Sequence, residues 1–245
     1  MDATSEPMPP HRGALGCVLV ALASSGCSAS VAPIEVAPGC PDGRARASAP
    51  ALAAADADLI DDFEHEGNAL PRRGDRNGTW ALGFGSDGSA EVEASGSDQC
   101  AFGGGRAGHF TANGLSERGP NWTALLRSQT GSGAQSIDAT AYAGISFWAA
   151  AGPGVATPYA LQVGVTTPAP SASRSDTACP GCMGYYIDEV ALEHHWQRFE
   201  LRFRDLVQFD NGNPLVPLRL DTLVGLVFWP DRDVDIWLDD VRFEP

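Results

Sequence analysis

The feature that most constrains this chain is a series of about ten short β-type segments with no long amphipathic helix among them. Most of these segments alternate apolar and polar residues, which is the period of a strand with one buried face. Turn-forming residues separate them, and the chain contains 28 Gly and 18 Pro. The pattern predicts an all-β fold, an antiparallel β-sandwich of the jelly-roll kind, over residues 57–245.

The predicted strands differ in how much of each is buried. The segment 144–150 is apolar on both faces and therefore predicts a central strand. The segment 196–203 alternates strictly, and we expect it to have one solvated face. A Pro- and Ser-rich loop is expected at 167–183, and one helical turn at 204–208. The full set of predicted strands is 59–64, 79–84, 90–93, 107–112, 123–127, 144–150, 159–165, 196–203, 223–229 and 234–243.

The first and last predicted strands both carry paired acidic residues. The first contains Asp61 and Asp62, and the last contains Asp239 and Asp240. Two short acidic strands at the two ends of a β-rich domain predict that the ends of the domain pair with each other and share a cation.

The N-terminus is typical of an export signal. His11 and Arg12 precede an apolar run, 13–23, and Ser-Ser-Gly-Cys27 follows it. This order predicts a signal peptide over residues 1–27 with Cys27 as a lipidated cysteine. The apolar run is shorter than the roughly 20 residues that a membrane-spanning helix needs. Because Ser24 stands where a lipoprotein signal prefers Leu, secretion without an anchor stays open as the alternative.

Residues 28–56 are rich in Ala, Pro and Ser and have no periodic apolar face. Such a composition predicts a disordered linker. Signal and linker together predict an exported protein, either an outer-membrane lipoprotein or an extracellular one, whose folded domain is held away from the membrane surface.

The charge of the chain limits its partners. The formal net charge is −15, and all 16 basic residues are Arg. Nucleic acids and anionic membrane surfaces require a basic footprint, so we expect neither as the main partner. Contact with a membrane is expected through the lipid anchor only.

The cysteines include one closely spaced pair, Cys179-Pro-Gly-Cys182. This spacing occurs in redox motifs and in half of a zinc site, but a second pair is missing. The pair lies in a Pro/Ser-rich loop, so in an exported protein we interpret it as a local disulfide. Cys40 and Cys100 pair with each other or remain reduced.

Several segments, taken in order, resemble one family. The segments 59–67, 76–80, 144–148, 179–184, 196–206 and 235–243 resemble successive parts of galactose-binding-like jelly rolls, the architecture of many carbohydrate-binding modules. The segments 179–184 and 196–206 are similar to the late part of a branch found in exported bacterial proteins, often lipoproteins. The resemblance covers residues 59–244 and implies the fold more strongly than the function.

The resemblance also implies a structural Ca²⁺. In that family a Glu of the first strand and an Asp of the last strand commonly bind the ion. The matching positions here are Glu64 and Asp239, with Asp62 and Asp240 as neighbours. The alternative is that all four are ordinary acidic residues that solvate strand ends.

Aromatic residues are the candidates for binding a sugar, because the apolar C–H face of a pyranose stacks on an aromatic ring. Alternation places Trp148 opposite Phe147 and Trp229 opposite Phe228, so both Trp side chains should project away from the core. If they share a concave face, they line one groove, and Tyr186 is a third candidate. For any single aromatic residue, packing in the core or at its rim is the competing interpretation.

No catalytic residue is predicted. Glycoside hydrolysis needs two facing carboxylates at a defined separation, and sequence alone places no such pair. The sequence therefore favours a non-catalytic exported module that binds a polysaccharide or a cell-surface glycan. A structural or protein-docking lipoprotein and a glycoside hydrolase or lyase are the alternatives.

Overall fold

The computed structural model describes residues 58–82, 89–93, 102, 106–113, 121–128, 135–168, 183–209, 215–230 and 232–245. These all belong to the unit Ile34–Pro245. The predicted signal peptide with Cys27, the linker 28–56, and Cys179 and Cys182 lie outside the described residues. Within the described residues, no helix is long and apolar enough to span a bilayer.

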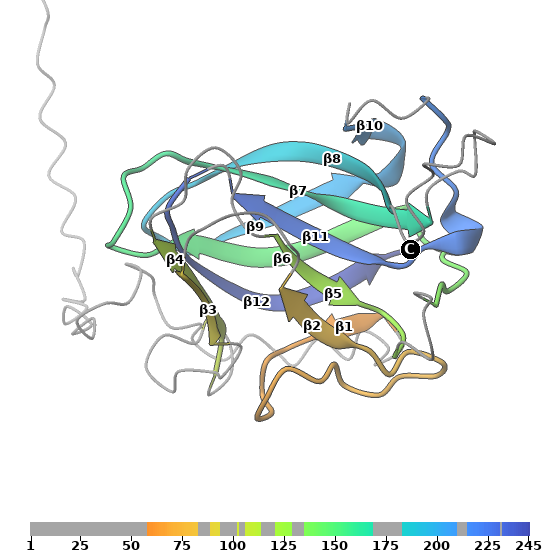
Figure 1. Cartoon of the computed structure of the whole chain (residues 1–245), viewed down its shortest axis with the longest axis horizontal. Helices are drawn as coiled ribbons and strands as arrows, with labels where there is room; N and C mark the ends of the chain where they lie inside the picture. The colour runs from red at the N-terminus through yellow and green to blue at the C-terminus, as the bar shows by residue number, and fades with distance from the viewer. Residues whose placement is uncertain are drawn as a thin grey trace, which may run out of the picture. The chain divides into compact units, whose positions relative to one another are not determined.

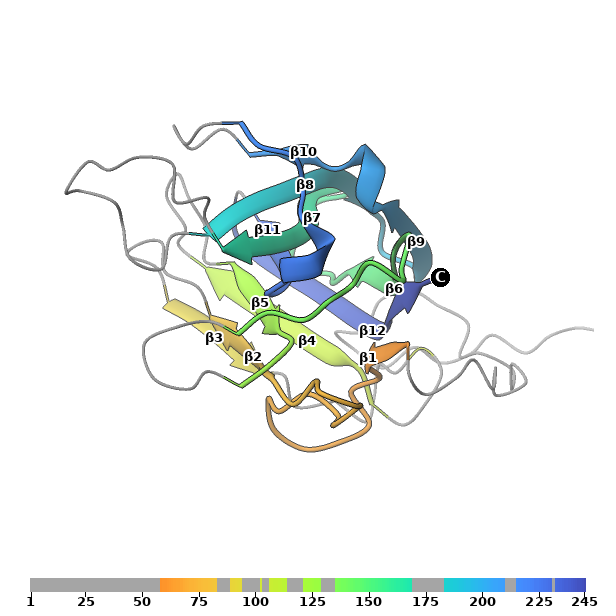
Figure 2. The same cartoon turned by 90° about the vertical axis from the view of Figure 1, so that its right-hand side faces the viewer.

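Twelve strands pair in two antiparallel sheets that form two layers (Figures 1 and 2). The first, sheet A, has the order β3-β4-β12-β6-β9, and β1 also pairs with β12. Sheet A contains β1 (Leu59–Asp61), β3 (Ser89–Glu93), β4 (Gly108–Asn113), β6 (Gly144–Ala151), β9 (Gln197–Arg202) and β12 (Val234–Glu244).

The second, sheet B, has the order β10-β8-β7-β11-β5-β2 and faces the viewer in Figure 1. It contains β2 (Thr79–Leu82), β5 (Trp122–Leu125), β7 (Tyr159–Pro168), β8 (Met183–Leu192), β10 (Val207–Gln208) and β11 (Gly225–Pro230). Two 3-10 turns, η1 (Phe203–Asp205) and η2 (Leu220–Thr222), complete the described elements. The predicted all-β sandwich is thus confirmed.

The core lies between the two sheets and is rich in aromatic side chains. Trp80 and Phe228 come from sheet B, and Phe110 and Phe147 come from sheet A. The Trp80 ring lies 5.3 Å from Phe110 and 5.8 Å from Phe228, so it packs against both layers. Because successive strand residues point to opposite sides, these residues take the inner positions and their neighbours take the outer ones. The outer positions therefore remain available for a site.

The two ends of the domain pair, as predicted. Leu59 pairs with Arg242 and Asp61 pairs with Val241, which places β1 beside β12. Two non-glycine residues nearby, Phe63 and Asp240, have positive φ angles of 56° and 50°. Such conformations cost about 1–3 kcal/mol each and persist where surrounding contacts hold them. The paired ends are therefore a locally strained part of the fold.

One strand was missing from the prediction. β8 covers Met183–Leu192, a range for which the sequence predicted no strand. It pairs with β7 over ten residues, from Tyr159↔Leu192 to Pro168↔Met183. The acidic residues Asp188 and Glu189 interrupt its apolar pattern, and both are exposed. The helical turn expected at 204–208 is a shorter 3-10 turn, η1, followed by β10.

Candidate ligand-binding face and the acidic end strands

The outer face of sheet B carries three aromatic side chains, Tyr185, Phe209 and Trp229, which we call the aromatic cluster. Tyr185 belongs to β8, Phe209 follows β10, and Trp229 belongs to β11. The Trp229 ring centroid lies 5.3 Å from that of Tyr185 and 5.1 Å from that of Phe209. The rings are tilted by 59° and 45°, and Trp229 remains partly exposed to solvent. Packing of this kind holds Trp229 in one orientation.

Local sequence explains why these rings can meet. In sheet B, Thr166 of β7 pairs with Tyr185, whereas Gln162 pairs with Trp229. On β7, Gly164 lies midway between Gln162 and Thr166. With no side chain at Gly164, the two rings can approach each other across the sheet. A Cβ atom at that position would lie only 1.9 Å from the carbonyl oxygen of Tyr186, so the sheet itself also requires glycine there.

Uncharged polar groups lie on the same face. The Thr123 hydroxyl donates a hydrogen bond to Oδ1 of Asn121 at 3.1 Å. Burial raises the pKa of the Tyr185 hydroxyl, although a hydrogen bond with Asn121 opposes the rise. Tyr185 therefore stays protonated at neutral pH and can donate as well as accept. Gln162, beside Trp229, adds an amide group.

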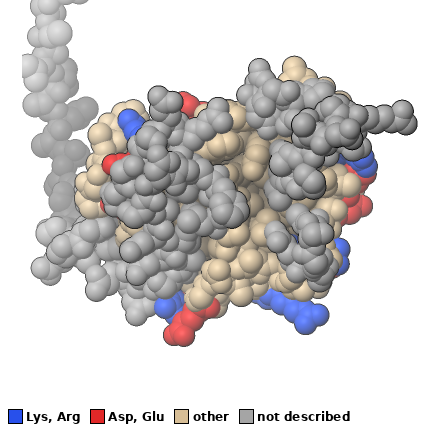
Figure 3. Space-filling model, in the orientation of Figure 1, with Lys and Arg blue, Asp and Glu red and all other residues tan. Residues whose placement is uncertain are grey.

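This face is nearly free of charge. Among the described outer positions of sheet B, Glu189 carries the single charge, and it is exposed. Figure 3 shows the same side of the molecule, where the described surface in the middle is uncharged and charged side chains lie toward the margins. Aromatic rings beside neutral hydrogen-bonding groups make a surface suited to a neutral, hydroxyl-rich ligand.

Trp148 and Trp229 do not share a groove, so that expectation is wrong. Trp148 lies on β6 of sheet A, paired with Asp239 and Arg198, whereas Trp229 lies on β11 of sheet B. Both project outward, as predicted, but from opposite sides of the sandwich. The Phe102 ring stacks on Trp148 at a centroid distance of 3.7 Å.

Tyr186 was also predicted to contact the ligand, but it lies in the core. Its side chain is 3% exposed and belongs to the core, and its hydroxyl donates to the carbonyl oxygen of Val216 at 3.1 Å. The preceding residue, Tyr185, takes the outward position. Residues in neighbouring strand positions point to opposite faces, so a shift of one residue reverses the assignment.

The acidic first strand is organised around Asp61 rather than Asp62. The Asp61 side chain is fully buried, and its Oδ2 atom accepts a hydrogen bond from the Trp80 indole at 2.7 Å. Its Oδ1 atom accepts from the Phe63 amide at 2.8 Å and contacts Nε2 of His65 at 2.9 Å. Asp61 thus holds the positive-φ turn at Phe63. No such role was predicted for Asp61, although its position beside Asp62 in an apolar strand is a recognisable signal.

The four predicted calcium ligands are placed as follows. Glu64 is exposed, and its Oε1 atom accepts from the Arg106 amide at 3.1 Å. Asp239 is 3% exposed, and its Oδ2 atom accepts from the Phe102 amide at 3.1 Å. Glu64 and Asp239, from the two ends of the domain, therefore accept hydrogen bonds from two residues that are close in sequence, Arg106 and Phe102.

The other two predicted ligands are already engaged. The Asp240 carboxylate pairs with the Arg242 guanidinium at 2.5 Å, and Asp62 accepts from the Glu64 amide at 3.3 Å. Among the described residues, no group of three or more His, Cys, Asp or Glu side chains is arranged to hold a metal. The four residues thus do not assemble as one complete set, and calcium binding by Glu64 and Asp239 stays a prediction.

Comparison with known proteins gives structural matches without sequence relatives. No family model and no curated protein matches the chain. The family 11 carbohydrate-binding module from Clostridium thermocellum, solved with a β-1,3-1,4-mixed-linked tetrasaccharide, matches with a TM-score of 0.51 and 14% identity. That match covers 76% of this chain and 94% of the other.

Two further matches are weaker. The family 11 module of the Clostridium thermocellum cellulase Lic26A-Cel5E has a TM-score of 0.48, 12% identity, and coverage of 76% and 92%. The CBM22-1 xylan-binding domain of Xyn10C from Paenibacillus barcinonensis has a TM-score of 0.40, 13% identity, and coverage of 76% and 92%. The first match, together with the two antiparallel sheets, identifies this domain as a β-sandwich jelly roll of the architecture found in carbohydrate-binding modules.

Proposed function

We propose that this protein is a non-catalytic, exported carbohydrate-binding protein whose ligand contacts the outer face of sheet B. The observation that carries the proposal is the aromatic cluster, in which the partly exposed Trp229 is held by Tyr185 and Phe209. A sandwich architecture shared with a glycan-binding module supports the proposal but does not carry it, since one fold hosts many functions.

The chemistry of the face fits a neutral polysaccharide. The apolar face of a sugar ring can lie on Trp229, and the Gln162 amide and Tyr185 hydroxyl are within the same part of the sheet to bond sugar hydroxyls. A charged ligand would require a compensating charge, and the described outer positions of sheet B offer the exposed Glu189 alone. We therefore infer a preference for uncharged glycans.

The small number of carboxylates at the described outer positions of sheet B favours a binding role over glycoside hydrolysis. Hydrolysis uses two carboxyl groups on either side of the scissile bond, about 5–10 Å apart. Within the described part of sheet B's outer face, Glu189 has no second carboxylate among the positions that alternate outward. A bound glycan on this face would meet aromatic and amide groups rather than an acid–base pair.

The test is a binding panel with two matched Trp variants. Soluble mixed-linked β-1,3-1,4-glucan, xylan and cellulose oligosaccharides are titrated into the full chain by calorimetry. We expect binding of at least one glycan, and Trp229→Ala should weaken it at least tenfold, about 1.4 kcal/mol. Trp148→Ala, on the opposite side of the sandwich, should leave the affinity unchanged.

Three outcomes would contradict the proposal. Binding that survives Trp229→Ala but is lost in Trp148→Ala would move the site to sheet A. No binding to any glycan in a wider panel would favour a structural or protein-docking role. Turnover of a bound glycan, measured by release of reducing ends, would instead establish a hydrolase or lyase.

Export and anchoring form the second part of the proposal, and they rest on the N-terminal sequence alone. Cys27 is proposed as the lipidated residue of an outer-membrane lipoprotein, with secretion without an anchor as the alternative. Metabolic labelling with a palmitate analogue in a bacterial host should label the protein, and Cys27→Ser should abolish the label. Secretion of an unlabelled wild-type protein would favour the unanchored alternative.

A further inference from the structure

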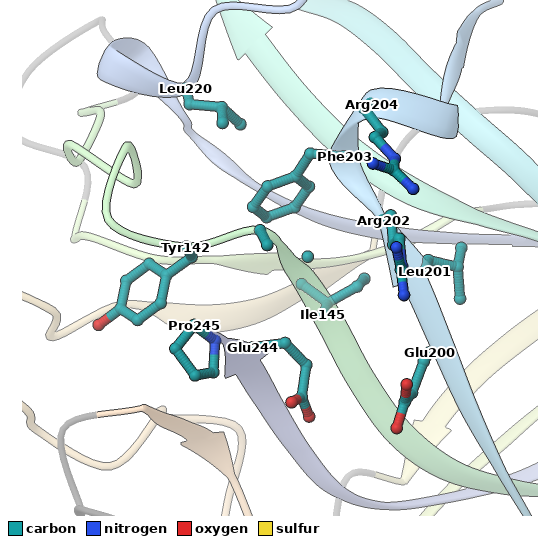
Figure 4. A pocket seen from close by; sticks show the side chains of 12 residues that line it. Tyr142, Ile145, Glu200, Leu201, Arg202, Phe203, Arg204, Leu220, Glu244 and Pro245 are labelled. Atoms are coloured by element: carbon teal, nitrogen blue, oxygen red, sulfur yellow. The ribbon is translucent and has the colours of Figure 1, made fainter.

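A pocket of about 510 Å³ opens at the edge of the sandwich, apart from the aromatic cluster. Its walls come from five elements, namely the start of β6, the end of β9, η1, η2 and the end of β12. Figure 4 shows Arg202 and Arg204 on one wall of the pocket, with Tyr142 and Pro245 across from them. The volume falls within the usual range for small-molecule sites, about 300–1,000 Å³.

A glycine produces the hollow between two charged residues. Gly144 on β6 pairs with Glu244 on one side and Arg202 on the other. Residues directly opposite each other in a sheet project to the same face, so Arg202 and Glu244 flank a position that has no side chain. A Cβ atom at Gly144 would lie 2.2 Å from the carbonyl oxygen of Leu201, so glycine is also needed for strand pairing.

The acidic groups of the pocket are already neutralised in part. The Arg198 guanidinium pairs with Glu244 at 2.8 Å and also with Glu200. The Ser146 hydroxyl donates a further hydrogen bond to Glu244. Arg198 thus lies between the two carboxylates and offsets the repulsion that they would exert on an incoming anion.

The two Arg side chains of the pocket wall are less involved in ion pairs than its two Glu side chains. In the described part of the chain, no carboxylate forms an ion pair with Arg202, which is exposed at the pocket wall. Arg204 contacts Asp205 at 3.6 Å, and both side chains are more than half exposed, so water screens that pair. The guanidinium of Arg202 is therefore available to a ligand, with that of Arg204 beside it (Figure 4).

The apolar side chains of the pocket that reach solvent are Tyr142 and Leu220, both half-buried. Ile145 is fully buried and Phe203 is 4% exposed, so both belong to the core behind the pocket. The Tyr142 ring stacks on Phe243 at 4.5 Å, which fixes that wall. Apolar side chains in the same pocket as an exposed guanidinium suit a ligand that has a ring-shaped body and one carboxylate, because the planar guanidinium can donate two parallel hydrogen bonds to a carboxylate.

We propose that this pocket is a second binding site, which takes a small ring-bearing carboxylate such as a uronic acid, with the carboxylate on Arg202 and the ring in the hollow over Gly144. The site differs in charge from the outer face of sheet B and does not depend on glycan binding there. A uronic acid and an aromatic carboxylate share the chemistry that the pocket recognises, and titration distinguishes them.

The experiment is calorimetric titration of the full chain with D-glucuronate, benzoate and, as the neutral counterpart, D-glucose. We expect at least one carboxylate to bind with a dissociation constant on the order of 1 mM, and glucose not to bind. Arg202→Gln should weaken carboxylate binding about tenfold or more. Arg202→Lys should weaken it less, since lysine keeps the positive charge but cannot donate two parallel hydrogen bonds to the carboxylate.

Three controls make the result decisive. Arg72→Gln removes an exposed Arg outside the pocket and should leave the affinity unchanged. Trp229→Ala should also leave it unchanged, which separates this site from the proposed glycan face. Thermal melts should show that Arg202→Gln folds, because Arg202 is exposed; if it does not fold, Arg202→Lys and a salt titration replace it. Equal binding of glucose, absence of carboxylate binding, or binding that persists in a folded Arg202→Gln variant would overturn the proposal.

Discussion

The two outer faces of the sandwich differ in the interactions that their side chains make: ion pairs are prominent on sheet A, and aromatic contacts among nearly uncharged neighbours on sheet B. On sheet A, Arg198 bridges Glu200 and Glu244, and Phe102 stacks on Trp148. On sheet B, three aromatic rings support one another and the described neighbours are almost uncharged. Away from the pocket at Gly144, the side chains on the outer side of sheet A are therefore largely in contact with one another, whereas the outer face of sheet B is suited to bind a neutral ligand.

The largest expected effect comes from the buried carboxylate that anchors β1 in sheet A. Asp61→Ala removes an acceptor for the Trp80 indole and the Phe63 amide and leaves both donors buried. We expect a loss of about 3–5 kcal/mol in the free energy of unfolding, measured by urea denaturation. Asp62→Ala, the partly exposed neighbour, should cost less than about 1 kcal/mol. Equal losses in the two variants would contradict the central role of Asp61.

Calcium removal tests the predicted link between the two ends of sheet A. If Glu64 and Asp239 bind Ca²⁺, EDTA should lower the melting temperature, because an ion at about 100 times its dissociation constant stabilises the fold by about 2.7 kcal/mol. Glu64→Ala and Asp239→Ala should each abolish the difference between melts in Ca²⁺ and in EDTA. A melting temperature that does not respond to EDTA would count against a calcium site.

The two outward Trp residues test the comparison directly through stability. Trp148→Ala removes the stack with Phe102, whose ring also contacts Trp196, and should cost about 1–2 kcal/mol of stability. Trp229→Ala should cost less stability, because its ring partners Tyr185 and Phe209 are themselves partly exposed, whereas Phe102 is buried. Thermal denaturation of both variants measures the difference, and the reverse order of stability would show that the aromatic cluster is structural.

The smallest expected effect is a pH dependence at His65. The hydrogen bond with Asp61 raises the pKa of His65 in the folded state, against the opposing effect of burial. A raised folded pKa means that this contribution to stability is fully present below the unfolded pKa of about 6.5, and it is lost as pH rises through the folded pKa. His65→Gln should therefore differ from wild type most at about pH 5.5 and least at about pH 9 in urea denaturation. A difference that does not change with pH would exclude the ionised pair.

Sequence reasoning was most reliable where it depended on the two-residue period of a strand. It predicted the β-sandwich, the pairing of the chain ends, and the outward direction of both Trp148 and Trp229. It was wrong by one position at Tyr186, where Tyr185 faces outward, and it did not single out Asp61 within the acidic first strand as the buried carboxylate that the fold uses. A one-residue change of register reverses the face of every side chain, so neighbouring residues of similar type are hard to assign.

Prediction from the sequence was least reliable for features that have no recognisable local pattern. β8 was not predicted, because its exposed Asp188 and Glu189 conceal the apolar alternation. The pocket at Gly144 was not foreseen either, since its walls come from residues between 142 and 245 that share no local pattern. No short stretch of sequence signals that Arg202 and Glu244 flank one glycine.

The sequence by itself determined that the chain forms a β-sandwich and that Trp229 and Trp148 leave the core, because alternation is a local property of each strand. Only the tertiary structure decided that these two residues occupy opposite sides, since the sheet to which a strand belongs depends on pairing with distant segments. β6 joins β12 and β9, and β11 joins β7 and β5. Those pairings separate the charged face of sheet A from the aromatic cluster of sheet B.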